Sequence, residues 1–303
     1  MLAVRPEEVQ RATQGRVGYC RQSISILRAG TAGTGLVRNG SRRNIGAGSC
    51  QALMRIEAMR YIASCSFGKD SLAAIIECER RGVHIDKALY CRIMFDAETS
   101  AELPEHEEFI YCKAVPLLQS RYGIETEIVQ ADVSYCDCFY RVWGDRSKIT
   151  GKIWGFPIQR GSWCNNYLKL APINRGLKTV GEHMQVLGIA ADETRRISHK
   201  TNQGKFLPLV EWGITEAQCF EICRREDLLS PAYNKGRKRL GCWFCHNQRI
   251  SELRRLRSEY PELWAKMLVL DKASLVRFTP DKTLTDFDRR FAEEERQLSF
   301  DFR

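Results

Sequence analysis

Residues 59–80 (MRYIASCSFGKDSLAAIIECER) constrain the fold of this chain more than any other stretch. A short apolar run, Tyr61 to Ala63, enters a six-residue polar turn at 66–71. Apolar residues then recur at the spacing of one helix face, at Leu72, Ile75 and Ile76. The pattern predicts a strand, a glycine turn and a helix. Free backbone N–H groups and the positive end of the helix dipole meet at such a turn, which makes it an anion site.

The polar turn also supplies side chains that suit a phosphate. Its members are Ser66, Phe67, Gly68, Lys69, Asp70 and Ser71. The serines and the lysine add hydrogen-bond donors, and the Asp70 carboxylate can hold hydrated Mg²⁺ against a phosphate, the usual way that proteins bind this ion. Lys69 and Asp70 are therefore candidate catalytic residues. A simpler interpretation is that Asp70 or Ser71 only caps a helix and that Gly68 only turns the chain.

Strands alternate with helices along the following part of the chain. The sequence predicts further strands at 87–95, 127–131 and 184–190 and helices at 104–122, 174–183 and 215–226. Pro116 is an obstacle inside the first of these helices, and Thr215 is a plausible cap of the last. This alternation is typical of an α/β fold with a doubly wound, mostly parallel, Rossmann-like sheet. Ligands bind such sheets at the carboxyl ends of the strands, where the turn at 66–71 is expected.

Charge and periodicity divide the chain into three regions. Of the net charge of +10, residues 1–58 contribute +6, with nine Arg, no Lys and three Glu. We expect this Arg-, Gly- and Ser-rich stretch to be a poorly ordered upstream extension before a natural start at Met59, with a transit peptide or a basic nucleic-acid tail as alternatives. Residues 59–248 form the predicted α/β domain, and 249–303 form a helical C-terminal segment.

Two segments of the chain are rich in basic side chains. Residues 132–163 are irregular and rich in aromatic and basic side chains, which suits a lid, a substrate loop or a plain insertion. The helix expected from 249 onward places several arginines opposite its apolar face. A solvated face is the expectation there, and a surface for a polyanion is the alternative.

Cysteine content and hydropathy bear on the location of the protein. Its 13 cysteines come without a plausible secretory signal, so we expect reduced thiols and a cytoplasmic protein. No run of about 18 apolar residues occurs, and no membrane partner is expected.

Five segments carry a resemblance to a known family. They are SFGKDS at 66–71, GSWCNNYLKLAPI at 161–173, GIAADETRR at 188–196, FLPLVEW at 206–212 and SPAYNKGRKRLGCWFC at 230–245. In this order they resemble the motifs of the phosphoadenosine phosphosulfate (PAPS) reductase family, within the N-type ATP pyrophosphatase (PP-loop) superfamily. The first segment is similar to the SGGxDS pyrophosphate loop, with Phe67 in place of the first glycine.

The resemblance implies a site for an adenosine nucleotide. Besides residues 66–71, it would use Lys169, Gly188, Glu193, Arg195 and Arg196. The three cations suit phosphate charge, and arginine can bind phosphate bidentately. Glu193 could hold one of the arginines or approach Mg²⁺. An ordinary set of surface ion pairs is the alternative.

A second chemical centre is expected at cysteines. Cys242 and Cys245 have the C-x-x-C spacing that lets two thiolates meet one metal. The resemblance places Cys164 near them, as a ligand and a catalytic residue. Three thiolates suit a [4Fe–4S] cluster with one open iron, as in some tRNA thiolases, or zinc with His246 as the fourth ligand. A metal-free redox pair is the third interpretation.

Two other pairs of cysteines have different expectations. Cys136 and Cys138 are an alternative source of metal ligands. Cys219 and Cys223 are spaced four residues apart on a predicted helix, and we expect them in the core.

Two departures from true sulfonucleotide reductases favour ATP chemistry. No cysteine follows Cys245, so the carboxyl-terminal ECGxH segment with their catalytic thiol is missing. The chain keeps the pair Lys69 and Asp70, which the reductases lack. The resemblance thus implies an enzyme that binds ATP with Mg²⁺, releases pyrophosphate by adenylating an acceptor, and transfers sulfur.

The implied partners are an adenosine nucleotide, an acceptor and a sulfur-donor protein. The acceptor is a nucleic acid, such as tRNA or DNA, or a small molecule. Two alternative functions stay open: a PAPS or adenylylsulfate reductase with an unorthodox cysteine, and a non-catalytic binding module stiffened by zinc.

Overall fold

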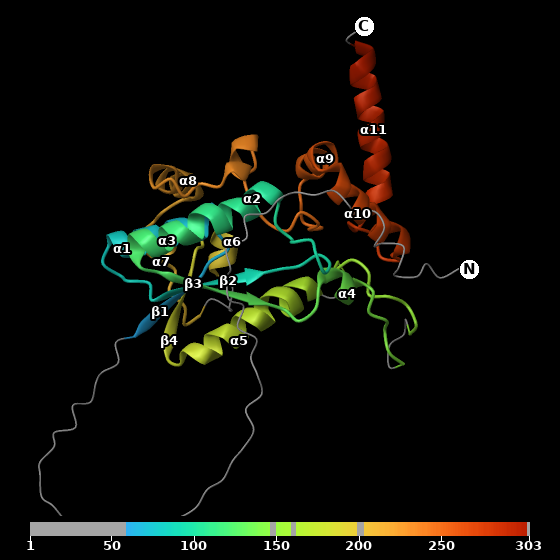
Figure 1. The fold of residues 1–303 in the computed structure, drawn as a ribbon. Coiled ribbons are helices and arrows are strands. Elements are labelled where there is room, and N and C mark those ends of the chain that lie inside the picture. Colours follow the sequence, from blue (N-terminus) through green and yellow to red (C-terminus); the bar gives the residue numbers. More distant parts are fainter. Residues whose placement is uncertain (1–58, 146–149, 159–161, 199–202, 302–303) are drawn as a thin grey trace, which may run out of the picture. The chain divides into compact units, whose positions relative to one another are not determined.

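A four-stranded parallel sheet lies at the centre of the computed structural model (Figure 1). The structure describes residues 59–145, 150–158, 162–198 and 203–301, so the predicted extension at 1–58 lies outside the described residues. The strands are β1 (Arg60–Ser64), β2 (Lys87–Arg92), β3 (Glu125–Gln130) and β4 (His183–Leu187), in the spatial order β3-β2-β1-β4. The chain builds the sheet outward from β1 to β3 and then crosses to the other side of β1, which confirms the predicted doubly wound α/β fold.

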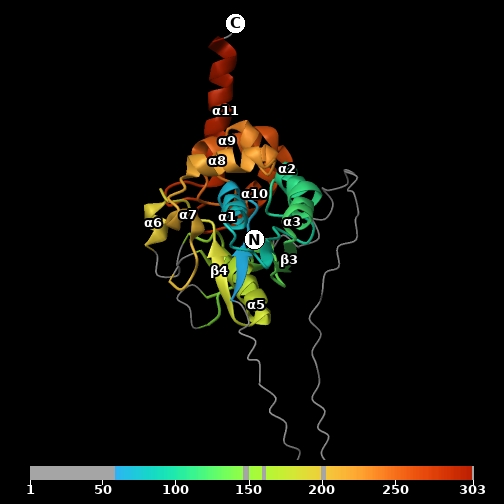
Figure 2. The same cartoon turned by 90° about the vertical axis from the view of Figure 1, so that its left-hand side faces the viewer.

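Helices cover both faces of the sheet (Figure 2). α1 (Lys69–Arg80), α2 (Pro104–Phe109) and α3 (Val115–Tyr122) lie on one face, and α8 (Glu216–Arg225) packs on α1. α5 (Ala171–Val180) covers the opposite face. The predicted apolar face of α1 is buried together with Cys219 and Cys223 of α8, which confirms these two cysteines as core residues.

Two π-helical segments each precede a proline. Ile110–Ala114 joins α2 to α3, whose second residue is Pro116, and Asn165–Leu170 leads into α5, whose second residue is Pro172. Proline has no N–H for the carbonyl four residues earlier, and its ring clashes with that carbonyl. We attribute the wider π turn to relief of this clash. The helix predicted at 104–122 therefore continues past Pro116.

The last three helices build a second hydrophobic core. α9 (Ile250–Glu259), α10 (Pro261–Ala273) and α11 (Leu284–Asp301) share it with α4 (Tyr135–Phe139) and with residues 243–244. The helical pattern after 249 breaks at Tyr260, because a residue before proline is disfavoured in the helical region. All described residues belong to one compact unit.

The arginines of α9 are engaged within the protein. Arg254 pairs with Glu294 of α11 at 2.7 Å, and Arg257 pairs with Asp288 and Glu295 of the same helix at 2.8 and 2.6 Å. These acidic partners offset the positive charge of the α9 face, which argues against the alternative of a polyanion surface there.

Among the described residues between β4 and α9, three short helices occur besides α8. They are α6 (Thr194–Ile197), α7 (Pro208–Glu211) and a 3₁₀ helix at Pro231–Lys235. The side chain of Thr215 accepts a hydrogen bond from the backbone N–H of Gln218, which confirms Thr215 as the cap of α8. The eleven cysteines in the described ranges are free thiols, and no helix there is long and apolar enough to span a membrane.

Candidate nucleotide site and cysteine group

The turn at 66–71 lies at the switch point of the sheet, beside the end of β4. Gly188 follows β4, and a Cβ atom added to it would lie 2.5 Å from the carbonyl oxygen of Asp70 and 2.6 Å from the Cα atom of Ser71. The two backbones therefore meet without room for any side chain. This close approach requires glycine at position 188, and it brings the residues after β4 next to the start of α1.

The backbone of the turn explains why the related motif has glycine where this chain has phenylalanine. Phe67 has a φ of 55°, in the left-handed region that glycine adopts without cost. Its ring is fully buried and packs edge-on against Tyr90, with 5.3 Å between the ring centroids. Burial of the ring offsets the strain, so the chain keeps the turn with a larger residue.

Internal hydrogen bonds close the turn. The hydroxyl of Ser71 donates to the carbonyl oxygen of Gly68 at 2.9 Å and accepts from the N–H of Ser66 at 3.3 Å. α1 begins at Lys69 with Gly68 as its N-cap, and no side chain caps it. The simpler interpretation of Asp70 as a helix cap is therefore wrong, and its carboxylate is available for other contacts.

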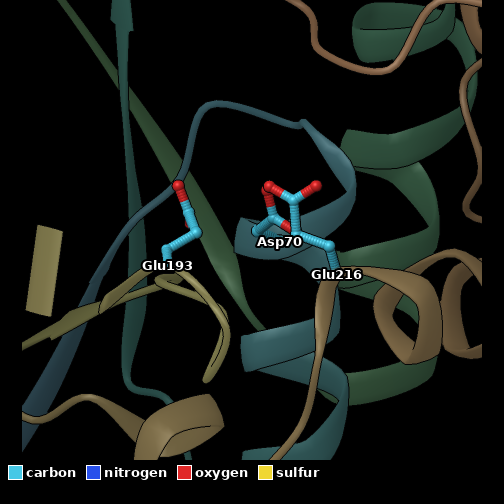
Figure 3. A group of neighbouring side chains, drawn as sticks. All are labelled: Asp70, Glu193 and Glu216. Carbon is cyan, nitrogen blue, oxygen red and sulfur yellow. The ribbon is translucent and has the colours of Figure 1, made fainter. Parts of the chain in front are cut away.

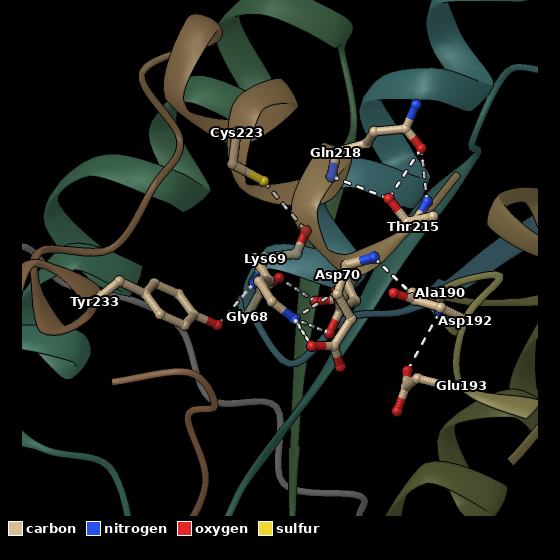
Figure 4. A network of polar contacts seen from close by, with 12 residues as sticks. Gly68, Lys69, Asp70, Ala190, Asp192, Glu193, Thr215, Gln218, Cys223 and Tyr233 are labelled. Atoms are coloured by element: carbon tan, nitrogen blue, oxygen red, sulfur yellow. Dashed lines mark hydrogen bonds and ion pairs between the residues drawn. The ribbon is translucent and has the colours of Figure 1, made fainter. Parts of the chain in front are cut away.

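Lys69 is a buried cation (Figure 4). Only 1% of its side chain is exposed, and its ammonium donates to both carboxylate oxygens of Asp70 at 2.8 Å. The Glu216 carboxylate lies 3.7 Å away. The backbone N–H of Lys69 donates to the hydroxyl of Tyr233 at 3.1 Å, across 164 positions of sequence. A buried charge needs such partners, because losing one leaves it uncompensated.

Three carboxylates lie near one another at the start of α1 (Figure 3). Asp70, Glu193 and Glu216 each offer an oxygen atom within 4.8 Å of the others, and no other three His, Cys, Asp or Glu residues do so within the described ranges. Hard oxygen ligands of this kind suit Mg²⁺. The sequence analysis missed Glu216, whose signal is its place as the first residue of α8, directly after the Thr215 cap.

Hydrogen bonds fix the segments that carry Glu193 and Glu216. The carboxylate of Asp192 accepts from the backbone N–H of Glu216 at 3.0 Å, and the N–H of Ala191 donates to the carbonyl of Ile214 at 2.8 Å. The loop after β4 is thus tied to the start of α8. This tie holds two acidic residues from separate segments at one place.

The three predicted phosphate-binding cations lie in different surroundings. Arg196 pairs with Glu193 at 2.8 Å, as one of the sequence interpretations expected, and Arg195 is exposed on α6. Lys169 is exposed on the second π segment, and its charge acts on Glu102 and Cys242. Lys169 therefore lies beside the cysteine group.

Cys164, Cys242 and Cys245 form this cysteine group. The backbone N–H of Cys245 donates to the carbonyl of Cys242 at 3.0 Å, which makes the predicted turn. Burial raises the pKa of Cys164 to about 11 and that of Cys242 well above its usual value, and the charge of Cys245 raises both further. The three thiols are near enough to interact, although their sulfur atoms do not lie within 4.8 Å of one another as a set.

A buried pair of titratable residues connects the turn with the cysteine group. Burial raises the pKa of Glu102 to about 7, and burial lowers the pKa of His106 to about 4. Their side chains lie 3.8 Å apart, Nε2 to Oε2. The backbone of Ser66 acts on His106, while Glu102 acts on Cys242. No motif marks these two residues, so the sequence analysis missed them.

Comparisons with known proteins give distant matches. No family model matches the chain. It is 25% identical to the uncharacterized protein MJ0066 of Methanocaldococcus jannaschii over 66% of this chain and 39% of that protein. MJ0973 of the same organism is 26% identical over 45% of this chain and 34% of that protein. The chain thus spans well under half of both relatives. The crystal structure of PAPS reductase from Candida auris, a phosphate complex, is 13% identical over 61% of this chain and 81% of that chain, with a TM-score of 0.38.

We predict that Gly188→Ala destabilises the protein. The new methyl group would collide with backbone atoms of Asp70 and Ser71, and backbone cannot move aside as a side chain can. The free energy of unfolding should fall by about 1–3 kcal/mol or more, measured by chemical denaturation. Gly144→Ala is the control, because an added Cβ there meets nothing within 4 Å. Equal stability of the two variants would contradict the close approach.

We predict that Glu102→Gln changes the pH dependence of stability. The folded state raises the pKa of Glu102 from 4.5 to about 7, so its contribution to stability is full below pH 4.5 and is lost as the pH rises through 7. The variant should therefore gain about 1–3 kcal/mol relative to the wild type between pH 5 and pH 8, measured by urea denaturation at both values. Glu98→Gln, at an exposed position, is the control. If the difference in unfolding free energy between Glu102→Gln and the wild type were the same at pH 5 and pH 8, the raised pKa of Glu102 would be refuted.

Proposed function

We propose that this chain is a PP-loop enzyme of the PAPS reductase type that binds ATP with Mg²⁺ and cleaves it between the α and β phosphates. The observation that carries the proposal is the buried ammonium of Lys69 beside three carboxylates at the switch point of the sheet. The five motifs in family order support it. A parallel α/β sheet binds its ligands at this point.

Each part of the site has a role in stabilising a leaving pyrophosphate. Lys69 and the N–H groups of the turn would bind its oxygens, where they act on charge that develops during the reaction. Asp70, Glu193 and Glu216 would hold Mg²⁺, which neutralises phosphate charge when bound. Gly188 keeps the site open at the end of β4, because a side chain there would displace the turn.

The reaction is adenylation followed by sulfur transfer. An acceptor oxygen attacks the α-phosphorus, the bond from that phosphorus to the bridging oxygen breaks, and pyrophosphate leaves with the electron pair. The acceptor then carries AMP. A donor protein would supply sulfur at the sulfide level (HS⁻), which bonds to the acceptor atom that carries the adenylated oxygen. The bond from that atom to the oxygen breaks, and AMP leaves with the oxygen and the electron pair, so the step consumes no oxidant or reductant. Cys164, Cys242 and Cys245 are the residues that would receive and present this sulfur.

Three cysteine thiols could hold either a [4Fe–4S] cluster with one open iron or a zinc ion with a fourth ligand. We propose the cluster, with Cys164, Cys242 and Cys245 as its ligands. Such a cluster supplies an iron site for sulfur when one iron lacks a protein ligand.

We predict that Lys69→Ala and Asp70→Ala each lower pyrophosphate release at least about 100-fold, because each removes stabilisation of the leaving group. The measurement is release of pyrophosphate from ATP with Mg²⁺ in the presence of candidate acceptors. Lys113→Ala is the matched control, since Lys113 pairs with Asp227 at the surface. Sulfite release from PAPS with a thiol donor, without pyrophosphate release, would favour the reductase instead. Neither activity, with zinc bound, would favour a binding module.

We predict that anaerobically purified protein contains iron and acid-labile sulfide and absorbs broadly near about 400 nm. Cys242→Ser should lose the iron, because Cys242 belongs to the cysteine group. Cys112→Ser should keep it, since Cys112 is an exposed thiol on the first π segment. Metal analysis that finds one zinc and no iron would overturn the proposal of a cluster. Protein that contains no metal would favour the third interpretation, in which the cysteines act as a redox pair.

A further inference from the structure

Three aromatic rings surround the ring of Trp154, in the part of the chain that leads to Cys164. The ring of Trp154 lies 5.5 Å from Trp143, 6.0 Å from Trp163 and 5.7 Å from Tyr167, measured between centroids. We name these four residues the aromatic platform. Trp163 directly precedes Cys164, and Tyr167 follows it by three positions on the π segment. The platform therefore stands beside the first cysteine of the group.

A short antiparallel pairing holds two of the rings. The backbone N–H of Trp143 donates to the carbonyl of Lys152 at 2.9 Å, and the N–H of Trp154 donates to the carbonyl of Arg141 at 2.8 Å. This pairing lies in the 132–163 segment, for which the sequence analysis left a substrate loop as one interpretation. The ring positions thus follow from backbone geometry as well as from side-chain packing.

The platform combines an exposed ring with a stacked guanidinium. The guanidinium carbon of Arg141 lies 5.3 Å from the Trp154 centroid and 5.4 Å from that of Tyr167, within the range of a cation–π contact. Tyr167 is 47% exposed. The buried neighbours Phe139 and Phe156 already fill the core beneath this segment. Nearly half of the Tyr167 side chain is thus accessible to a flat ligand.

Positive charge is concentrated in the same part of the chain. Residues 138–180 contain eight Lys or Arg and one Asp, whereas the rest of 59–303 contains 30 basic and 33 acidic residues. Lys152, Lys169, Arg175 and Lys178 are exposed members of this basic stretch. Clustered cations complement the phosphates of a nucleic acid, and aromatic rings stack on bases whose faces are not already paired in a duplex.

We propose that the aromatic platform binds an unpaired base of a single-stranded nucleic acid. Stacking on Tyr167 and Trp154 would hold the base, and the basic residues would hold the flanking phosphates. As the acceptor of adenylation, this base would lie next to the cysteine that presents sulfur. The acceptor role rests on the proposed function, whereas the binding itself does not.

The test is fluorescence anisotropy of the full chain with labelled oligonucleotides. The probes are single strands of RNA and of DNA of about 20 nucleotides and the corresponding duplexes, long enough to cover one binding site. Tyr167→Ala should weaken single-strand binding about tenfold or more, because it removes one stacking partner. Tyr167→Phe keeps the ring and should bind like the wild type. Leu275→Ala, at another exposed apolar position, should also leave binding unchanged.

Three results would overturn this proposal. Tyr167→Ala could bind single strands as well as the wild type, Tyr167→Phe could lose as much affinity as Tyr167→Ala, or duplexes could bind as tightly as single strands. The last result would mean that charge alone attracts the nucleic acid. The basic residues 1–58 are present in every variant, so their contribution cancels in the comparison. Because Tyr167 is at the surface, unchanged thermal melting should verify that each variant is folded.

A separate variant distinguishes this proposal from the proposed function. Lys69→Ala should lose pyrophosphate release and keep the affinity for single strands. Lys69 is buried in the turn at 66–71 and does not belong to the aromatic platform. Failure of the wild type to cleave ATP would refute the enzyme and leave the stacking site standing. Cleavage of ATP with no effect of Tyr167→Ala on single-strand binding would refute the stacking site and leave the enzyme.

Discussion

The burial of one ammonium group determines much of this structure. Lys69 is 1% exposed, and it is held by carboxylates from α1 and α8 and by the Tyr233 hydroxyl at its backbone. A charge in such a place is stable only when its partners are fixed. The loop after β4, the start of α8 and the 3₁₀ helix at Pro231–Lys235 must therefore converge on the turn after β1. That convergence creates the three-carboxylate group at the same time.

Two titratable side chains connect the turn at 66–71 with the cysteine group. Glu102 and His106 lie between the turn and the cysteines, where burial raises the pKa of the acid and lowers that of the base. His106 is therefore uncharged at neutral pH, whereas Glu102 changes its charge close to neutral pH.

Local signals predicted most of the elements and part of the site. The turn at 66–71, the four strands and the Thr215 cap follow from apolar periodicity, glycine placement and capping chemistry. The effects of proline were harder to predict. Pro116 and Pro172 are accommodated by π turns, whereas Pro261 follows a true break at Tyr260.

The sequence by itself determined the α/β alternation, the polar turn at 66–71 and the C-x-x-C pair, because each depends on residues close together in the chain. Only the tertiary structure decided that Glu216 joins Asp70 and Glu193, that Arg254 and Arg257 are engaged by α11, and that the exposed ring of Tyr167 packs against Trp154. These contacts join residues distant in sequence. They depend on the order of the strands and on the close approach at Gly188, which no local pattern encodes.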